Sequence, residues 1–381
     1  MKTKKSNTMS NSSNTDYDWG NTPWFKRRFS HPERTIRIAT SFSGIGAAEY
    51  ALKRLGLKHE IVFACDNGER YLKFRYPRLA EIAKGLSCDD KKNYAEFLLK
   101  ANRPKINSLT FENIYNNLFV ECTDTRTELE LAKECIDLVT KELSYAETLD
   151  YVNGLYESTK KKNHVKESYM ANYELDEKNW HNDIRFLDGS QYKGMIDLYV
   201  GGSPCQSYSQ SGKRLGLEDT RGTLFYDFAK VIKECEPKVF IYENVKGMAT
   251  HDNGNSWDVV RGVFESLGYD IHYKVLNSKD YNVPQNRERL FCIGFKKETE
   301  FLFPVPVKQQ HTIADLLIDK TQGTVRQLTP REDLRYMGFD DHFKQVVANH
   351  VMTHQCGNSI VVDVFMALYK QMDITQYGVV K

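Results

Sequence analysis

The amino-acid sequence predicts a doubly wound α/β fold on a mostly parallel sheet, with an inserted helical subdomain. Short β-branched strands alternate with helical stretches, and glycine-rich or polar segments follow several strands. The 381 residues, 40% of them hydrophobic and 27% charged, provide enough apolar material for a sizeable core. In such a sheet, ligands bind at the carboxyl ends of the strands.

The expected elements follow one another in this alternation. Residues 36–40 predict a buried strand entering a tight turn, and residues 47–57 predict the helix that follows. Further strands are expected at 61–64, 196–200, 239–242, 271–275 and 290–295, and the clearest later helices at 224–234 and 257–267. Each strand candidate is short and rich in apolar residues, as buried parallel strands are.

Two stretches have a different composition. The first 34 residues are rich in Ser, Asn, Thr and Lys and lack the apolar core of a signal peptide. Residues 73–180 hold very few glycines and are expected to be mainly helical, for example over Glu128–Leu143. Within them, residues 81–180 contain 14 Lys or Arg against 19 Asp or Glu, so this insert is acidic.

Composition also excludes several classes of protein. The formal net charge of +2 is too small to indicate a charged partner. The sequence has no apolar run of about 18 residues, so no membrane span is expected. Eight cysteines occur without a CxxC pair. This pattern predicts neither a metal site nor a disulfide framework, and it indicates reduced thiols and a cytoplasmic location.

A glycine turn directly follows the first strand. Its residues are Ser41, Phe42, Ser43, Gly44, Ile45 and Gly46. Glycines let the backbone approach a ligand, and Asp66 at the end of the second strand is placed to accept hydrogen bonds from ribose hydroxyls. A dinucleotide and another adenosine cofactor both fit this pattern, although Glu49 would repel a pyrophosphate.

A cysteine follows the strand at 196–200. Cys205 comes after Gly201, Gly202 and Pro204, just past the carboxyl end of a central strand. A single cysteine is more often a small buried apolar residue than a catalyst. Here the flanking glycines allow close approach, and nearby positive charge would favour the reactive thiolate.

Two charged segments are expected at the same edge of the sheet. Glu243 directly follows an apolar strand, where a carboxylate is costly without a partner or a task. Arg287 and Arg289 lead into the strand at 290–295 and share one face of an extended segment, so both can point into one cleft. A thiol, an acid and two arginines at one edge together indicate a catalytic site.

These segments resemble the DNA (cytosine-5) methyltransferases over most of 35–295 and again over 325–372. The matching stretches are SFSGIG at 41–46, GGSPCQSYSQSGKRLGLEDTRGTLF at 201–225, YENV at 242–245, LNSKDYNVPQNRERLFCIGF at 276–295, LTPREDLRYMGF at 328–339 and QCGNS at 355–359. Their order and spacing make a chance match negligible.

The resemblance implies S-adenosylmethionine as the cofactor and the Rossmann-like sheet of methyltransferases as the fold. By matching position it implies that the cofactor is held by Phe42, Ser43, Gly44, Ile45, Gly46, Asp66, Asp183, Asn358 and Ser359. The chain then divides into a polar leader (1–34), a catalytic domain in three parts (35–72, 181–295 and 326–381), an insert (73–180) and a short segment (296–325). A helix after Ser359 is expected to pack back on the domain.

The resemblance also implies the chemistry. Cys205 would add to C6 of a cytosine flipped out of duplex DNA, with Glu243 on the N3 and amino edge and Arg289, backed by Arg287, on O2. Loss of the C5 proton after methyl transfer would release 5-methylcytosine. The residues expected near the base or the DNA are Gln206, Ser209, Ser211 and Lys213.

One departure from the family pattern bears on recognition. Members usually carry a target-recognition domain of on the order of a hundred residues after the QNRER strand, whereas about thirty residues separate Phe295 from Gln327 here. The insert, a separate recognition chain, or weak sequence preference and another nucleic acid remain open as explanations.

The expected function is therefore cytosine-5 methylation of DNA, in a bacterial or phage restriction-modification system, by a chain taken as a monomer by default. The first rival is methylation of transfer RNA, since one branch of similar proteins does this. A cofactor-binding regulator without catalysis is a second rival, opposed by the intact Cys205, Glu243 and Arg289. An NAD-dependent oxidoreductase is a third, and it rests on the glycine turn alone.

Overall fold

The computed structural model describes residues 23–70, 143–157, 161–204, 220–318 and 326–380. The catalytic-loop candidates Cys205, Gln206, Ser209, Ser211 and Lys213 lie outside these residues, as does nearly all of the expected helix over 128–143. Within the described part, no helix is long and apolar enough to cross a membrane.

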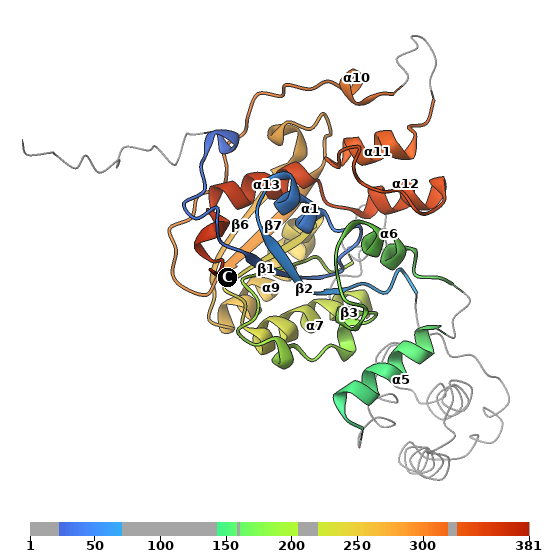
Figure 1. The fold of residues 1–381 in the computed structure, drawn as a ribbon. Coiled ribbons are helices and arrows are strands. Elements are labelled where there is room, and N and C mark those ends of the chain that lie inside the picture. The colour runs from blue at the N-terminus through green and yellow to red at the C-terminus, as the bar shows by residue number, and fades with distance from the viewer. Residues whose placement is uncertain (1–22, 71–142, 158–160, 205–219, 319–325, 381) are drawn as a thin grey trace, which may run out of the picture.

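A seven-stranded sheet forms the centre of the fold (Figure 1). Its strands are β1 (Ile36–Ser41), β2 (His59–Cys65), β3 (Trp180–His181), β4 (Leu198–Gly201), β5 (Val239–Val245), β6 (Asp270–Asn277) and β7 (Glu288–Phe295). Their order in the sheet is β3-β2-β1-β4-β5-β7-β6. The first five are mutually parallel, and β7 runs antiparallel to both of its neighbours. The predicted doubly wound, mostly parallel fold is confirmed.

The α-helices of the described residues surround this sheet. They are α1 (Ala47–Arg54), α5 (Tyr145–Glu157), α6 (His164–Asn172), α7 (Thr220–Cys235), α8 (Lys246–Thr250), α9 (Asn255–Ser266), α10 (Ile313–Leu316), α11 (Pro330–Tyr336), α12 (Asn349–Asn358) and α13 (Val362–Gln371). Short 3₁₀ turns occur at Trp24–Lys26, Glu177–Asn179, Ile184–Phe186, Gly189–Tyr192, His251–Gly254, Ser278–Tyr281 and Ile374–Gln376.

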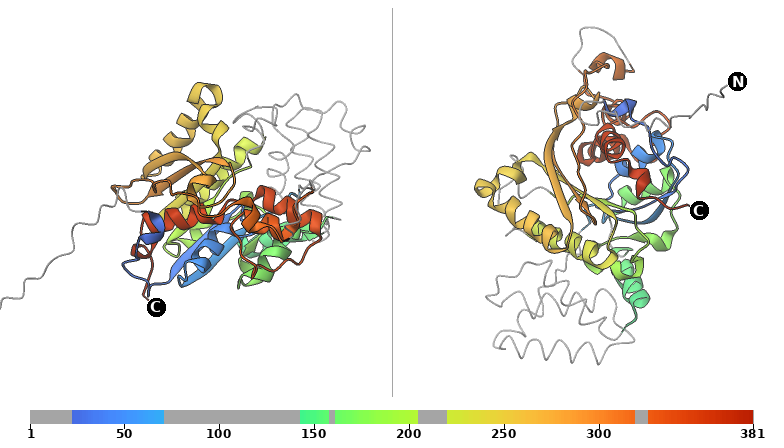
Figure 2. Two further views of the ribbon diagram at one scale, coloured as in Figure 1. Left: turned by 90° about the horizontal axis from the view of Figure 1, so that it is seen from above. Right: turned by 90° about the vertical axis from the view of Figure 1, so that its left-hand side faces the viewer.

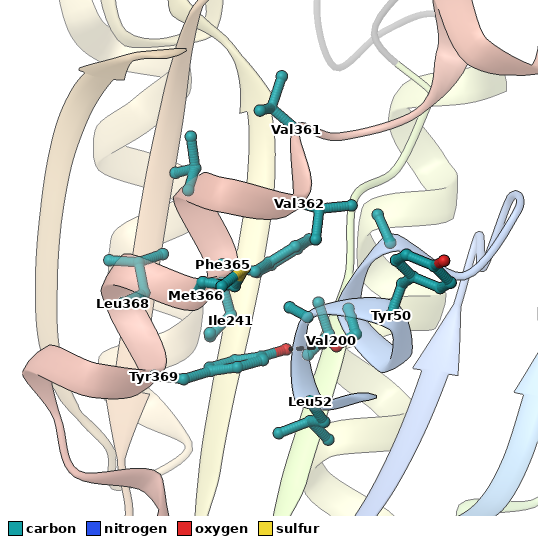
Figure 3. Close-up of a cluster of buried hydrophobic side chains, with 14 of the residues drawn as sticks. Tyr50, Leu52, Val200, Ile241, Val361, Val362, Phe365, Met366, Leu368 and Tyr369 are labelled. Atoms are coloured by element: carbon teal, nitrogen blue, oxygen red, sulfur yellow. Dashed lines mark hydrogen bonds between the residues drawn. The ribbon is translucent and has the colours of Figure 1, made fainter. Parts of the chain in front are cut away.

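Two hydrophobic clusters cover the two faces of the sheet, as expected when side chains alternate along buried strands. One face packs against α1 and α13, and the other against α7 and α9 (Figures 1 and 2). Figure 3 shows Phe365 and Tyr369 of α13 between α1 and the sheet, in the same cluster as Val200 and Ile241. The expected packing of a helix after Ser359 against the domain is therefore observed.

Several boundaries differ from the sequence prediction for identifiable reasons. Strand β5 continues through Glu243 to Val245, because β7 pairs with it along its whole length, ending at the Val245–Arg289 pair. Strand β3 has only two residues, too few for a periodic pattern to reveal.

The end of the polar leader packs on the domain, with Trp24 and Arg27 buried.

The part of the expected insert around α6 belongs to the main core. Tyr169 and Tyr173, on and just after α6, lie in the same hydrophobic cluster as α1 and α13. Asn172 exchanges two hydrogen bonds with the backbone of Lys344, which ties α6 to the carboxyl-terminal segment. Helix α6 is thus a layer of the catalytic domain.

Candidate active site

The strand register brings the conspicuous sequence segments to one edge. Ser41 pairs with Cys65 on one side and with Gly201 on the other, and Gly201 pairs with Tyr242. These residues end or nearly end parallel strands, so Asp66, the glycine turn, the Gly201–Pro204 turn and Glu243 follow one another in this order along the carboxyl edge. This is where ligands bind in open α/β sheets.

The glycine turn is shaped by backbone conformation. Phe42, Gly44 and Gly46 all have positive φ, of 55°, 53° and 77°. A Cβ on Gly46 would lie 2.4 Å from the Tyr173 ring, whereas within the described residues, apart from the two chain neighbours of Gly44, no atom lies within 4 Å of a Cβ on Gly44. The turn is therefore closed at Gly46 by packing and open at Gly44, where a ligand has room.

Two other members of the turn serve its architecture. Ser43 Oγ accepts a hydrogen bond from the Cys65 amide at 3.0 Å, which joins the turn to β2. The Ile45 side chain is fully buried in the core beside α1. Backbone groups of both residues are engaged as well. The Ser43 amide donates to the Cys65 carbonyl at 3.2 Å, the Ser43 carbonyl accepts from the Gly46 amide at 3.0 Å, and the Ile45 carbonyl accepts from the Tyr173 hydroxyl at 3.1 Å.

Asp66 is fixed by backbone donors. Its carboxylate accepts from the Gly44 amide at 2.9 Å and from the Gly68 amide at 2.8 Å. Burial raises the pKa of Asp66 above its usual value, and these two hydrogen bonds oppose the rise. A carboxylate has about four lone-pair sites, so Asp66 retains acceptor capacity for hydroxyl groups of a ligand.

Asp183 has close protein partners on both carboxylate oxygens. Arg185 forms a buried ion pair with it, and Tyr156 of α5 donates to Oδ2 at 2.6 Å. Burial alone would raise the pKa of Asp183, but the Arg185 charge and these hydrogen bonds outweigh it, and the pKa lies below its usual value. Any ligand contact would share an oxygen that already accepts hydrogen bonds.

The carboxyl-terminal candidates approach the same region. Asn358, at the end of α12, donates to Glu69 Oε1 at 2.9 Å, and His354 contacts the same oxygen at 2.8 Å. Ser359 is buried directly after the helix. Because Glu69 comes three residues after Asp66, these contacts hold the end of α12 beside the segment that follows β2.

The Gly201–Pro204 turn packs tightly between β1 and Glu243. A Cβ on Gly201 would lie 2.5 Å from the Ser41 carbonyl oxygen, and one on Gly202 would lie 2.4 Å from the Glu243 carbonyl oxygen. The same Cβ on Gly202 would lie 3.0 Å from Glu243 Oε2. Glycine is therefore required here because the backbone passes directly over the acid.

Glu243 and Arg289 form an ion pair across β5 and β7. Arg289 Nε lies 3.2 Å from Glu243 Oε1, and only 13% of the glutamate side chain is exposed. Burial raises the pKa of Glu243, while the charges of Arg289 and Arg287 oppose the rise. This pair places an acid with a raised pKa beside a fixed cation, an arrangement suited to holding and protonating a polar base.

Arg287 reaches a different partner from its neighbour. Its Nη2 donates to the Gly357 carbonyl at 3.0 Å and to the Ser359 carbonyl at 2.8 Å. Two arginines that the sequence places on one face thus divide their contacts, with Arg289 on the acid and Arg287 on the end of α12. Both still contribute positive potential at Glu243.

Sequence reasoning missed several residues that shape the site. The pairing of Arg185 with Asp183 has a sequence signal, because opposite charges two residues apart flank a single apolar residue. Tyr156 and Tyr173 have no such sequence signal, since their partners lie far away in the chain.

The described residues contain no group of three or more His, Cys, Asp or Glu that would hold a metal ion.

Comparisons with known proteins show the family of this chain. The family model for C-5 cytosine-specific DNA methylases matches residues 146–325 and 308–373. The type II methyltransferase M1.ScrFI of Lactococcus lactis subsp. cremoris is 30% identical, over 54% of this chain and 68% of the relative. M.NgoBI of Neisseria gonorrhoeae and M.HhaI of Haemophilus parahaemolyticus are 43% and 45% identical over about a third of this chain, but the matches span only 42% and 39% of those relatives.

Solved structures show the same fold. The crystal structure of the S. pombe Dnmt2 methyltransferase aligns with a TM-score of 0.52 and 15% identity, covering 88% of this chain and 98% of that one. A DNA modification methyltransferase encoded in an E. coli prophage aligns with the same TM-score, identity and coverage. From the family match and the residues above, this chain belongs to the C-5 cytosine-specific DNA methylases.

Proposed function

We propose that this chain transfers a methyl group from S-adenosylmethionine to C5 of cytosine in duplex DNA through a covalent bond between Cys205 and C6. The observation that carries the proposal is the Glu243–Arg289 ion pair, whose acid packs against the Gly201–Pro204 turn. This turn ends directly before Cys205 in the sequence. The family membership of the chain supports the same reaction.

The residues that follow β1 and β2 fit the cofactor that the family implies. Asp66 retains acceptor capacity for ribose hydroxyls, and the turn is open at Gly44. The proposed cofactor residues are Phe42, Ser43, Gly44, Ile45, Gly46, Asp66, Asp183, Asn358 and Ser359, with Ser43 and Ile45 acting by holding the shape of the turn. When bound, S-adenosylmethionine supplies an electrophilic methyl group on sulfur.

The chain's own residues then activate the base. The Cys205 thiolate adds to C6, and the electron pair moves toward N3, which Glu243 protonates or hydrogen-bonds. C5 becomes nucleophilic and would form the bond to the methyl group as the bond from that group to the cofactor sulfur breaks, leaving S-adenosylhomocysteine. A proton given to N3 would return to Glu243. Loss of the C5 proton to a base and breakage of the sulfur–C6 bond restore the aromatic ring and the thiolate.

The raised pKa of Glu243 suits this role. A carboxyl group that keeps its proton at a higher pH than a free glutamate can donate to N3 of the incoming base. Arg289 would hold O2 of the base while its charge keeps the acid oriented. In this proposal Arg287 supports the arrangement from behind, through the carbonyls at the end of α12.

Access to the base requires flipping. C5 and C6 of a stacked cytosine are out of reach of a protein thiol, so the target must leave the duplex at a cost of a few kcal/mol. Gln206, Ser209, Ser211 and Lys213 are the proposed base and DNA contacts and lie outside the described residues. A Ser211→Ala variant with unchanged duplex affinity and turnover would remove that residue from the contact set.

Sequence recognition is proposed to come from outside the short segment at 296–325. Its described part has one helix, α10, with four residues. In the described part of the insert, Tyr156 donates to Asp183 and Tyr169 donates to Glu49, so these two side chains are engaged within this chain. Residues 71–142 of this chain or a separate chain are therefore the proposed readers of DNA, within a cytoplasmic restriction-modification system of a bacterium or phage.

The test offers the purified protein methyl-labelled S-adenosylmethionine with mixed-sequence duplex DNA and, separately, with bulk transfer RNA. Label in DNA as 5-methylcytosine, absent from a Cys205→Ser variant that still binds the cofactor, is the expected result. Bisulfite sequencing then shows whether one chain selects a motif. Label in transfer RNA alone would contradict the proposal.

A further inference from the structure

The turn before the proposed nucleophile is fastened to β5 by side chains that have no part in the mechanism above. Ser203 Oγ lies 2.7 Å from Tyr242 Oη, and both side chains are buried. Asn244 Nδ2 donates to Tyr242 Oη at 2.9 Å and to the Ser203 carbonyl at 3.3 Å. The hydroxyl and the carbonyl of Ser203 are thus both held, two residues before Cys205.

The tyrosine that makes this contact is itself held firmly. Its ring packs against Phe225, Phe228 and Phe264, with centroid distances of 5.9, 5.3 and 5.5 Å. Phe225 and Phe228 belong to α7, the first helix described after Cys205. Chain segments on both sides of the nucleophile therefore meet at Tyr242.

The hydrogen-bond directions are consistent with a fixed chain of donors. Asn244 accepts from the Val245 amide through Oδ1, so its Nδ2 points toward Tyr242 and Ser203 as a donor. The tyrosine hydroxyl accepts from Asn244 and retains its own proton to share with Ser203. Removing the hydroxyl would leave two buried polar groups without this partner, so the turn would shift to satisfy them.

We propose that Tyr242, through Ser203 and Asn244, is a positioning residue that sets where the chain presents Cys205 to the base. This inference rests on the proposed function, because it assumes that Cys205 attacks C6. Tyr242 touches neither base nor cofactor in this account. Covalent catalysis depends steeply on geometry, and a displacement of about 1 Å can cost on the order of a hundredfold in rate.

The test compares Tyr242→Phe with wild type in single-turnover methyl transfer to unmodified mixed-sequence duplex DNA at saturating cofactor. We expect the rate to fall about tenfold or more while the Kd for S-adenosylmethionine stays within about twofold. Ser203→Ala should give a similar defect, and the double variant should be no slower than the slower single variant, because both changes break the Ser203–Tyr242 contact.

Tyr269→Phe is the matched control. Tyr269 is buried in the same hydrophobic cluster, and its hydroxyl donates to the Pro237 carbonyl at 2.8 Å, at the start of β5 and away from the site. A rate for Tyr242→Phe within about threefold of wild type, an equal slowing in Tyr269→Phe, or a parallel loss of cofactor affinity would each overturn the inference.

Two further readouts keep the outcome decisive. If thermal melting shows that Tyr242→Phe does not fold, Ser203→Ala is judged by the same criteria. If the wild-type protein transfers the methyl group to transfer RNA and none to DNA, the proposed function itself fails. An active wild type with an unaffected Tyr242→Phe variant removes only the role of Tyr242.

Discussion

Replacing Arg287 with alanine separates the two arginines that the sequence places on one face. Arg287 donates to the Gly357 and Ser359 carbonyls, whereas Arg289 pairs with Glu243. The variant should therefore loosen the end of α12, where Asn358 and Ser359 are the proposed cofactor contacts. Cofactor affinity should fall, and the acid should keep its ion pair.

The magnitude follows from the two hydrogen bonds. The bond to Ser359 is partly buried and the bond to Gly357 is exposed, so their combined contribution is about 2 kcal/mol. If this segment must be ordered for the cofactor to bind, the loss corresponds to a Kd about 30-fold weaker. Arg287→Lys should recover part of it, since a single ammonium can reach one carbonyl.

Isothermal titration of S-adenosylmethionine without DNA measures this effect directly, with Arg289→Ala as the matched control. We expect Arg289→Ala to bind the cofactor within about twofold of wild type, because its partner is Glu243. An Arg287→Ala protein that binds the cofactor normally but no longer methylates DNA would refute this division of roles. That result would indicate that Arg287 acts in the base pocket.

Two further predictions concern buried residues near the glycine turn. Burial raises the pKa of the Glu49 carboxyl group in the folded protein. The folded state therefore keeps the Glu49 proton at pH values above about 4.3, where the unfolded chain loses it. The stability of the wild-type protein should fall as the pH rises from that value toward the folded pKa, by at most about 1.4 kcal/mol per pH unit. Glu49→Gln should flatten that fall in urea unfolding between pH 4.5 and 7.5, and parallel curves for the two proteins would contradict it. Gly46→Ala should destabilise the protein through its positive φ and the Tyr173 ring, whereas Gly44→Ala should cost only about 1–2 kcal/mol of strain yet weaken cofactor binding. Thermal melts with cofactor titration distinguish the pair, and an unaffected Kd in Gly44→Ala would place the ligand elsewhere.

Local patterns in the sequence were sufficient for most of the sheet. The alternation of β-branched runs with helices predicts six of the seven strands, because each is a short apolar run next to a turn. The sequence does not predict strand β3, because two residues are too few to show a periodic pattern. The extension of β5 to Val245 is not predicted either, since it depends on pairing with β7, whose residues lie more than forty positions later.

The candidate site was predictable in composition but not in contacts. Asp66, Glu243 and Arg289 stand out because a charged residue beside a buried strand needs a reason. The partner of Arg287 lies some seventy residues away in the chain, and nothing in its own segment points there. Tyr169 looks like one tyrosine in a polar helix, yet it is fully buried and donates to Glu49 at 2.7 Å. Long-range pairs of this kind are set by tertiary packing.

Covalent trapping tests the central claim most directly. Duplex DNA of mixed sequence, with 5-fluorocytosine in place of cytosine, is incubated with the protein and S-adenosylmethionine, then resolved on a denaturing gel. Fluorine at C5 cannot leave as the proton does, so the sulfur–C6 bond would persist. The account predicts a stable protein–DNA band with wild type, none with Cys205→Ser, and a strongly reduced band with Glu243→Gln. A band of wild-type intensity in Cys205→Ser, or methylated DNA without any trapped complex, would contradict it.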